Sequence, residues 1–85
     1  MRRYVITAAA ERDLHRLERS ARQRIFDALD RLVGDPPQGD VRKLSGRKDE
    51  WRLRVGDWRI RFRYDRAAKT IVVLRVLDRR DAYRD

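Results

Sequence analysis

Apolar and charged residues alternate over one stretch near the middle of the chain, EWRLRVGDWRIRFRY, which runs from Glu50 to Tyr64. Such alternation is typical of strands with one buried face and one exposed face. The pair Gly56-Asp57 separates two alternating runs, and a glycine in the first loop position favours a tight hairpin turn. The stretch therefore predicts an antiparallel hairpin of two strands.

A two-residue loop also fixes which residues of the hairpin lie opposite one another. The predicted pairs are Val55–Trp58, Arg54–Arg59, Leu53–Ile60, Arg52–Arg61 and Trp51–Phe62. All the apolar residues then share one face and all the arginines share the other. Like charges directly opposite in a ladder are destabilising. The arginines are either solvated and screened by salt, or they bind an anion such as phosphate, which suits the planar guanidinium group. We favour the anion, because no acidic residue separates the arginines.

Helical spacing of apolar residues precedes the hairpin. A short strand is predicted for residues 4–7, and Thr7 is a suitable N-cap for a helix that begins at Ala8. Ser20 is expected to end this helix and cap the next, because Ser20 and Gln23 have the spacing of a capping box. The second helix should end at Gly34, since two prolines follow it.

The remaining segments complete a sheet. Residues 34–46 are predicted to be a polar loop in which Lys43 and Leu44 begin the approach to the hairpin. Residues 70–77 are almost continuously apolar, as expected of a central strand. If Val72, Leu74 and Val76 face the helices, Arg75 and Arg79 fall on the arginine side.

The predicted order is β-α-α-β-β-β. This order predicts a two-layer α+β fold, with a helical hairpin packed on one face of a mainly antiparallel sheet. A chain of 85 residues is expected to form a single domain over residues 1–85.

The charge of the chain narrows the choice of partners. The formal net charge is +9 and the pI is about 11.1, which favours nucleic acid first and an anionic membrane surface second. No apolar run approaches the roughly 20 residues that span a bilayer, and no signal peptide is recognisable. There is no cysteine, so disulfides and thiolate chemistry are excluded. We expect a cytoplasmic protein that does not associate with membranes.

The sequence offers no pattern for metal or cofactor chemistry. His15 is the only histidine and has no neighbouring residues with metal-ligand spacing. No glycine-rich phosphate loop occurs, and we expect neither a metal nor a small-molecule cofactor. The acidic residues of the two helices are expected to form surface ion pairs with nearby arginines. These residues are Glu11, Asp13, Glu18, Asp27 and Asp30.

Three segments together resemble the RelE/ParE superfamily of toxins, on the RelE side. They are KLSGRKDEWRLRVGDWRIRFRY from Lys43, IVVLRV from Ile71, and VLDRRDAYRD from Val76. The resemblance implies a toxin of a type II toxin–antitoxin system that is silenced by a cognate antitoxin protein. It further implies an endoribonuclease (an mRNA interferase) that cleaves mRNA in the decoding site of the ribosome and inhibits translation.

The resemblance also assigns roles to individual residues. Arg59, Arg79 and Tyr83 match the catalytic positions of RelE-like members, and Asp78 stands where many similar sequences have His or Lys. Nucleic-acid binding is assigned to further basic residues, at some of which family members often carry a basic side chain. These residues are Arg52, Arg54, Arg61 and Lys43.

The residue types suit the chemistry of RNA cleavage. The 2′-hydroxyl must attack the adjacent phosphate while charge develops on the phosphoryl oxygens. We assign charge stabilisation to Arg59 and Arg79, and proton transfer or base stacking to Tyr83. Two alternatives stay open. A ParE-like member would bind and inhibit DNA gyrase without a nuclease site, and a third possibility is an RNA-binding module without catalysis.

Overall fold

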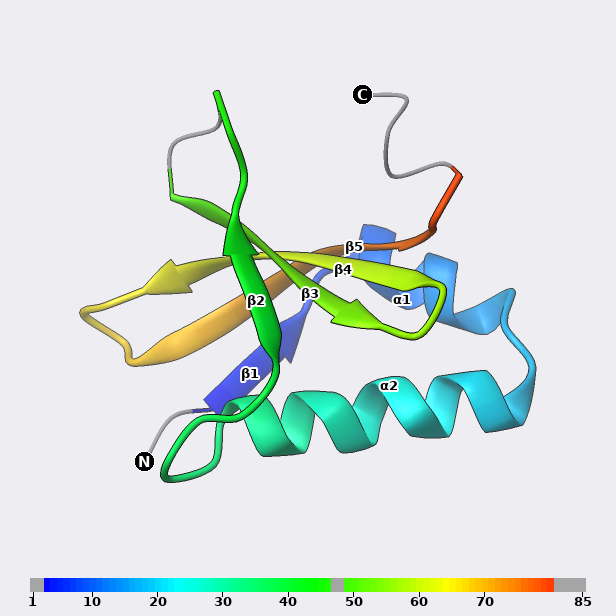
Figure 1. The fold of residues 1–85 in the computed structure, drawn as a ribbon, viewed down its shortest axis with the longest axis horizontal. Coiled ribbons are helices and arrows are strands. Elements are labelled where there is room, and N and C mark those ends of the chain that lie inside the picture. Colours follow the sequence, from blue (N-terminus) through cyan, green and yellow to red (C-terminus); the bar gives the residue numbers. More distant parts are fainter. Residues whose placement is uncertain (1–2, 47–48, 81–85) are drawn as a thin grey trace.

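The computed structural model describes residues 3–46 and 49–80 of the chain. Two helices and five strands follow one another along it (Figure 1). They are β1 (Arg3–Ile6), α1 (Ala8–His15), α2 (Arg19–Leu32), β2 (Asp40–Lys43), β3 (Glu50–Val55), β4 (Trp58–Asp65) and β5 (Thr70–Asp78). The strands form one sheet in the order β1-β5-β4-β3-β2. Only β1 and β5 are parallel, so the predicted α+β class with a mainly antiparallel sheet is confirmed.

The β3–β4 hairpin has the predicted register. All five expected pairs are present, and a sixth places Glu50 opposite Arg63. Gly56 has a φ of 56°, a left-handed conformation that glycine adopts without a steric penalty. Leu53 and Ile60 belong to the buried core. Because side chains alternate along a strand, the hairpin arginines lie on the opposite face of the sheet.

The start of α1 is also as predicted. The Thr7 hydroxyl oxygen accepts a hydrogen bond from the Ala10 N–H (3.3 Å), which satisfies one of the donors left open at a helix N-terminus. The same hydroxyl lies 2.9 Å from the Val73 carbonyl oxygen of β5, to which it donates. One side chain therefore caps the helix and attaches it to the sheet.

The junction between the helices differs from the prediction. The first helix ends at His15, and the second begins at Arg19 with Glu18 in the N-cap position. Ser20 lies inside α2, so its expected capping role is wrong. The Glu18 side chain makes no capping hydrogen bond, so no side-chain cap marks the start of α2.

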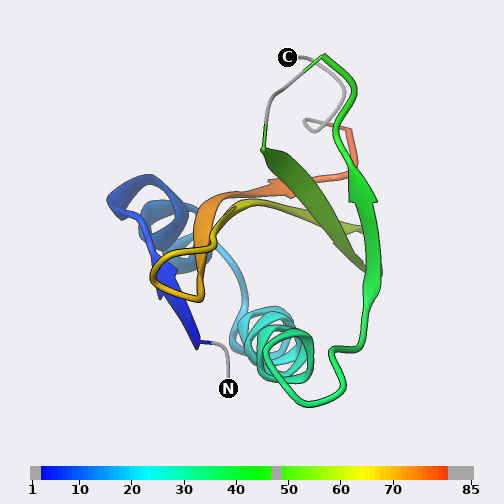
Figure 2. The same ribbon diagram turned by 90° about the vertical axis from the view of Figure 1, so that its left-hand side faces the viewer.

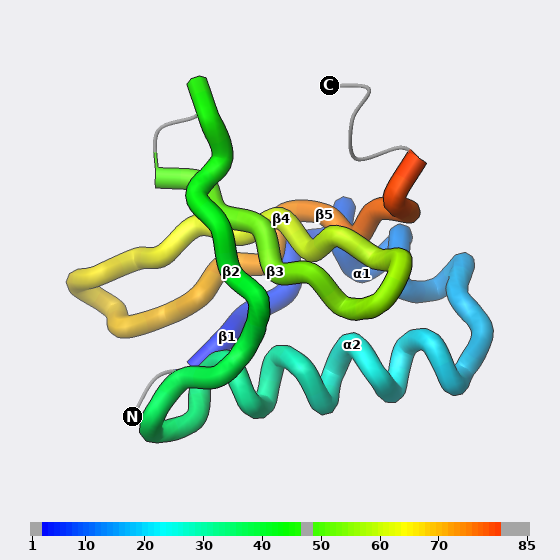
Figure 3. Tube along the Cα trace, viewed as in Figure 1, coloured from blue at the N-terminus to red at the C-terminus, as the bar shows by residue number. Residues whose placement is uncertain are grey.

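The segment predicted as a loop contains the edge strand β2. It pairs antiparallel with β3, from Asp40 opposite Arg54 to Lys43 opposite Trp51. Val41 is the only apolar residue of this strand, so no alternating pattern marks it in the sequence. Figure 3 shows the chain turning at the end of α2 and running along β2 before it enters β3.

The inward face of β5 also differs from the prediction. Ile71, Val73 and Val76 are buried in the core, whereas Val72 and Leu74 are only partly buried. A register shift places Arg61 opposite Arg75 but Phe62 opposite Val73, so β5 has one extra residue at Leu74. Such a bulge changes which alternate residues face inward. It is the reason that Val76 was predicted correctly and the other two were not.

The core lies between α2 and the concave face of the sheet, which curves around this helix (Figure 2). The helix contributes residues at helical spacing to one apolar face. They are Ile25, Ala28, Leu29 and Leu32, which belong to one buried cluster with Leu53, Ile60, Phe62 and Val73 of the sheet.

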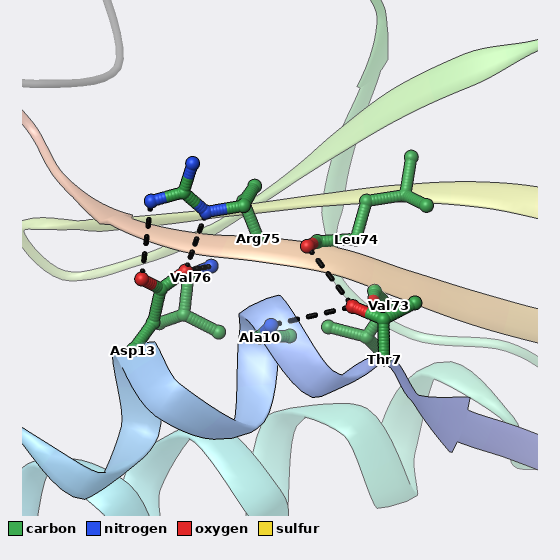
Figure 4. Close-up of polar contacts among 7 residues, drawn as sticks. All are labelled: Thr7, Ala10, Asp13, Val73, Leu74, Arg75 and Val76. Atoms are coloured by element: carbon green, nitrogen blue, oxygen red, sulfur yellow. Dashed lines mark hydrogen bonds and ion pairs between the residues drawn. The ribbon is translucent and has the colours of Figure 1, made fainter.

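Helix α1 covers an open edge of the sheet. The pairing of β1 with β5 ends at Val73, and α1 follows along the rest of this edge (Figure 4). The Asp13 carboxylate accepts a hydrogen bond from the Val76 N–H (2.9 Å), so this edge group has a partner although it is buried. Asp13 is only 8% exposed. The predicted helix-surface ion pair is therefore wrong for this residue, whose partner is Arg75 on β5.

Candidate nucleic-acid interface

Arginines form two rows across the face of the sheet that points away from α2. The shorter row consists of Arg54 and Arg59, which lie opposite each other next to the β3–β4 turn. The longer one, called here the arginine row, consists of Arg42, Arg52, Arg61 and Arg75, paired in succession across β2, β3, β4 and β5. Neighbouring strands lie about 4.8 Å apart, so four cationic side chains cross the sheet at close spacing.

Sequence reasoning found only part of the arginine row. The hairpin pattern indicated Arg52 and Arg61, and the predicted strand indicated Arg75. Arg42 was missed because it lies on β2, whose single apolar residue gave no strand signal.

Carboxylates from three elements approach the arginine row, contrary to the expectation that no acidic residue separates the arginines. One Asp40 oxygen lies 3.9 Å from Nη2 of Arg52, and one Glu50 oxygen lies 4.0 Å from Nη2 of Arg61. The contact between Asp13 and Arg75 is closer, at 2.8 Å. The expectation failed because β2 and α1 supply charges that are distant from the hairpin in the sequence, and because Glu50, the first residue of β3, approaches Arg61 on the neighbouring strand.

Two of the hairpin arginines are buried. Arg59 is 5% exposed and Arg61 is 8% exposed. Nη1 of Arg59 donates to the carbonyl oxygens of Gly56 (3.0 Å) and Trp58 (3.2 Å). Within the described part of the chain, Nε of Arg59 and Nε of Arg52 are buried and have no hydrogen-bond partner. A buried donor without a partner is costly.

Two of the three residues predicted to be catalytic meet at the β3–β4 turn. The Arg79 N–H donates to the Asp57 carbonyl oxygen (2.8 Å), which places the exposed Arg79 beside the turn whose carbonyls hold Arg59. Asp78 accepts a hydrogen bond from the Arg80 N–H (3.0 Å) and so stabilises the turn that carries Arg79. Tyr83, the third predicted residue, lies outside the described residues.

Lys43 lies apart from the other predicted nucleic-acid-binding residues. Its neighbour Arg42 belongs to the arginine row, so alternation places Lys43 on the opposite face of β2. Its ammonium group is 5.9 Å from the centre of the Trp51 ring. Both residues line a groove of about 570 Å³ on the helix side of the sheet, whose walls also include Leu32, Phe62 and Tyr64.

Residues 3–46 and 49–80 were also compared with the requirements of a metal site and of a membrane-spanning helix. No group of three or more histidine, cysteine, aspartate or glutamate residues there could hold a metal ion. In the same residues, neither helix is long and apolar enough to cross a membrane.

Comparison with known proteins identifies the family. The family model described as the ParE toxin of the type II toxin–antitoxin system parDE matches residues 4–83. This chain belongs to the ParE toxin family. It is therefore a toxin of a type II toxin–antitoxin system, within the RelE/ParE superfamily. A search of curated proteins found no match.

Solved structures place the fold of this toxin among RelE proteins. A chain of the RelBE2 toxin–antitoxin complex from Mycobacterium tuberculosis is 26% identical with a TM-score of 0.78, and the match covers 92% of this chain and 98% of that one. A chain of the archaeal RelE–RelB complex from Pyrococcus horikoshii is 28% identical with a TM-score of 0.73, and the match covers 92% of this chain and 93% of that one. The isolated RelE toxin of Escherichia coli has a TM-score of 0.75 at 15% identity, over 92% and 84% of the two chains. This last likeness concerns the fold alone.

Proposed function

We propose that this toxin is an endoribonuclease that cleaves mRNA on the ribosome and thereby inhibits translation in the cytoplasm. The observation that carries the proposal is the environment of Arg59. Its guanidinium group is buried and keeps an unpartnered Nε, and Arg54 and Arg79 lie at the same end of the hairpin. These positions suit a phosphate clamp, because the planar guanidinium group can hold two oxygens.

The proposed reaction is attack of the RNA 2′-hydroxyl on the adjacent phosphate. Arg59 stabilises the charge that develops on the phosphoryl oxygens, and a buried donor does so more strongly than a solvated one. The carbonyl oxygens of Gly56 and Trp58 fix its orientation before the substrate binds. Arg79 supplies a second cation from the exposed side. Arginine keeps its proton at physiological pH, so we assign proton transfer to Tyr83.

We further infer that a cognate antitoxin protein silences this toxin. Two of the similar solved structures are toxin–antitoxin complexes. The net charge of +9 favours an acidic segment in the antitoxin, because opposite charges speed association and select the partner. Coexpression with the product of the adjacent gene should restore growth. Failure of every neighbouring product to bind the toxin would contradict this inference.

Single-turnover cleavage of a ribosome-bound message tests the nuclease. Arg79→Ala should lower the rate at saturating ribosomes by about 10²–10³, the typical loss when one donor to a developing charge is removed. Arg59→Lys keeps the charge but loses the planar guanidinium group, so this variant should also cleave slowly. Arg24→Ala on α2 removes the same charge from the far side of the molecule and should cleave as fast as the unaltered protein. Equal rates for all four proteins would contradict the assigned mechanism.

One observation favours the gyrase inhibitor as a second candidate. Carboxylates already approach Arg52, Arg61 and Arg75, so much of the arginine row is neutralised within the protein, and the matching family model is that of ParE. Expression in cells separates the two functions. New mRNA ends within translated codons would support the nuclease, whereas altered DNA supercoiling with intact messages would support the gyrase inhibitor.

A further inference from the structure

The chain leaves β5 through a turn in which two successive peptide groups are held by hydrogen bonds. The Arg79 N–H donates to the Asp57 carbonyl oxygen of the β3–β4 turn (2.8 Å). The next N–H, that of Arg80, donates to a carboxylate oxygen of Asp78, the last residue of β5 (3.0 Å). The backbone of Arg79 is therefore fixed on both sides, beside the turn whose carbonyl oxygens hold Arg59.

The Asp78 carboxylate also approaches the side chain of Arg80. Nε of Arg80 lies 3.6 Å from the same oxygen, and this arginine side chain is 88% exposed, so the ion pair itself contributes little. The hydrogen bond to the backbone is the stronger contact. It has the form that aspartate and asparagine favour in turns, because their short side chains reach the N–H two residues further on. The two consecutive arginines are thus held differently, Arg79 by the β3–β4 turn and Arg80 by Asp78.

We propose that Asp78 is a positioning residue, which fixes the turn after β5 and so keeps Arg79 beside Arg59 before RNA binds. Asp78 does not contact the substrate and acts only through Arg79. A catalytic group that is aligned in advance spares the reaction the cost of ordering it, and small displacements of such a group slow the chemical step. This inference rests on the role that the proposed function gives to Arg79, and it adds the residue that holds Arg79 in place.

Two substitutions of Asp78 separate its hydrogen bond from its charge. Asp78→Asn keeps an oxygen that can accept the Arg80 N–H, whereas Asp78→Ala removes it, and both variants lose the same charge. In single-turnover cleavage at saturating ribosomes, Asp78→Ala should be slower than the unaltered toxin by about tenfold, and Asp78→Asn should stay within about threefold of it. The ribosome concentration for half-saturation should be the same for the two variants, because the lost contact affects the chemical step and not binding.

A double variant shows whether Asp78 acts through Arg79. Added to Arg79→Ala, Asp78→Ala should slow cleavage by less than about a further twofold, because no side chain is left to position. Equal losses with and without the Arg79 side chain would overturn the proposal. Asp65→Ala is the matched control, since the Asp65 carboxylate accepts the Ala68 N–H in the same way (3.1 Å). That turn lies at the other end of β4, roughly 20 Å away, so this variant should cleave as fast as the unaltered toxin.

Amide hydrogen exchange of the free toxin tests the positioning without cleavage. Loss of the turn contact in Asp78→Ala should speed exchange of the Arg79 N–H by about fivefold. Asp78→Asn and Asp65→Ala should change this rate by less than about twofold. This exchange pattern in a toxin that does not cleave would refute the nuclease but not the positioning of Arg79. Normal cleavage with equal exchange in Asp78→Ala and Asp78→Asn would refute the positioning and leave the nuclease intact.

Discussion

Two aspartate–arginine contacts of this toxin differ in almost every physical respect. Asp13 and Arg75 meet at 2.8 and 3.1 Å through two hydrogen bonds, and the same carboxylate accepts the Val76 N–H. Asp40 and Arg52 approach only to 3.9 Å. The Asp13 side chain is 9% exposed and that of Asp40 is 53% exposed. The first contact joins α1 to β5, whereas the second lies between the neighbouring strands β2 and β3.

The difference separates a carboxylate that stabilises the fold from one that contributes little to it. The three hydrogen bonds of Asp13 occupy three of its roughly four acceptor sites, so its burial is largely compensated. Asp40 approaches Arg52 only at long range and is itself 53% exposed, and ion pairs with such a solvated partner contribute little to stability. The same residue types therefore stabilise the fold in one place and contribute little to it in the other.

The largest effect should come from Asp13. Asp13→Asn removes the charge that balances Arg75 and places an amide against the Arg75 and Val76 donors. We expect a loss of about 2 kcal/mol in the free energy of unfolding, because the amide cannot serve all three donors, while Arg75, whose side chain is 45% exposed, keeps access to water. Urea unfolding followed by circular dichroism measures it. Asp27→Asn is the control, because Asp27 accepts one exposed hydrogen bond from Gln23 and should change stability by less than about 0.5 kcal/mol.

The pH dependence of stability sharpens this result. Burial raises the pKa of Asp13, but hydrogen bonds from Arg75 and Val76, with the charges of Arg75 and Arg16, outweigh burial and lower the pKa overall. Because the pKa of Asp13 is lower in the folded protein than in the unfolded chain, where it is about 3.9, the ionised carboxylate stabilises the folded protein at pH values above about 3.9. That stability is lost as the pH falls through the folded value. The difference between the unaltered protein and Asp13→Asn should be constant from about pH 5 to 7 and shrink below about pH 4. A difference that grew in acid would contradict this assignment.

The parts of the fold that the sequence predicted depend on local patterns. The hairpin register followed from a two-residue loop and strict alternation, and the start of α1 followed from the Thr7 cap. The segments that were missed depend on distant contacts. β2 has a single apolar residue and forms by pairing with β3, and the inward face of β5 depends on a bulge.

The candidate site likewise contains residues that local patterns indicated and contacts that depend on distant parts of the chain. The arginines of the hairpin could be located from the alternation, and the family resemblance added Arg79. The sequence could not show that Arg59 is buried against its own turn, because burial depends on how the sheet curves. Nor could it show that Asp40 and Asp13 approach Arg52 and Arg75, because each pair joins residues that are far apart in the chain.

Thr7 should have an intermediate effect, because its hydroxyl also joins α1 to β5. Thr7→Ala removes the helix cap and the donor to the Val73 carbonyl. The expected loss is about 1–2 kcal/mol in the free energy of unfolding, the upper range for cap removal. Thr7→Ser keeps the hydroxyl and should lose less than half of that. If Ser were as destabilising as Ala, packing of the Thr7 methyl group, and not the hydrogen bonds, would hold α1 in place.

The smallest effect on stability should come from Asp40, and it tests the comparison most directly. In a double-mutant cycle with Asp40→Asn and Arg52→Gln, the coupling energy should stay below about 0.5 kcal/mol, since the two groups are 3.9 Å apart and Asp40 is 53% exposed. A parallel cycle with Asp13→Asn and Arg75→Gln should give a coupling several times larger. Urea unfolding of the single and double variants supplies both values. Equal couplings would mean that Asp40 belongs to the fold as Asp13 does. A weak coupling would show that this carboxylate approaches the arginine row without contributing to the stability of the sheet that carries it.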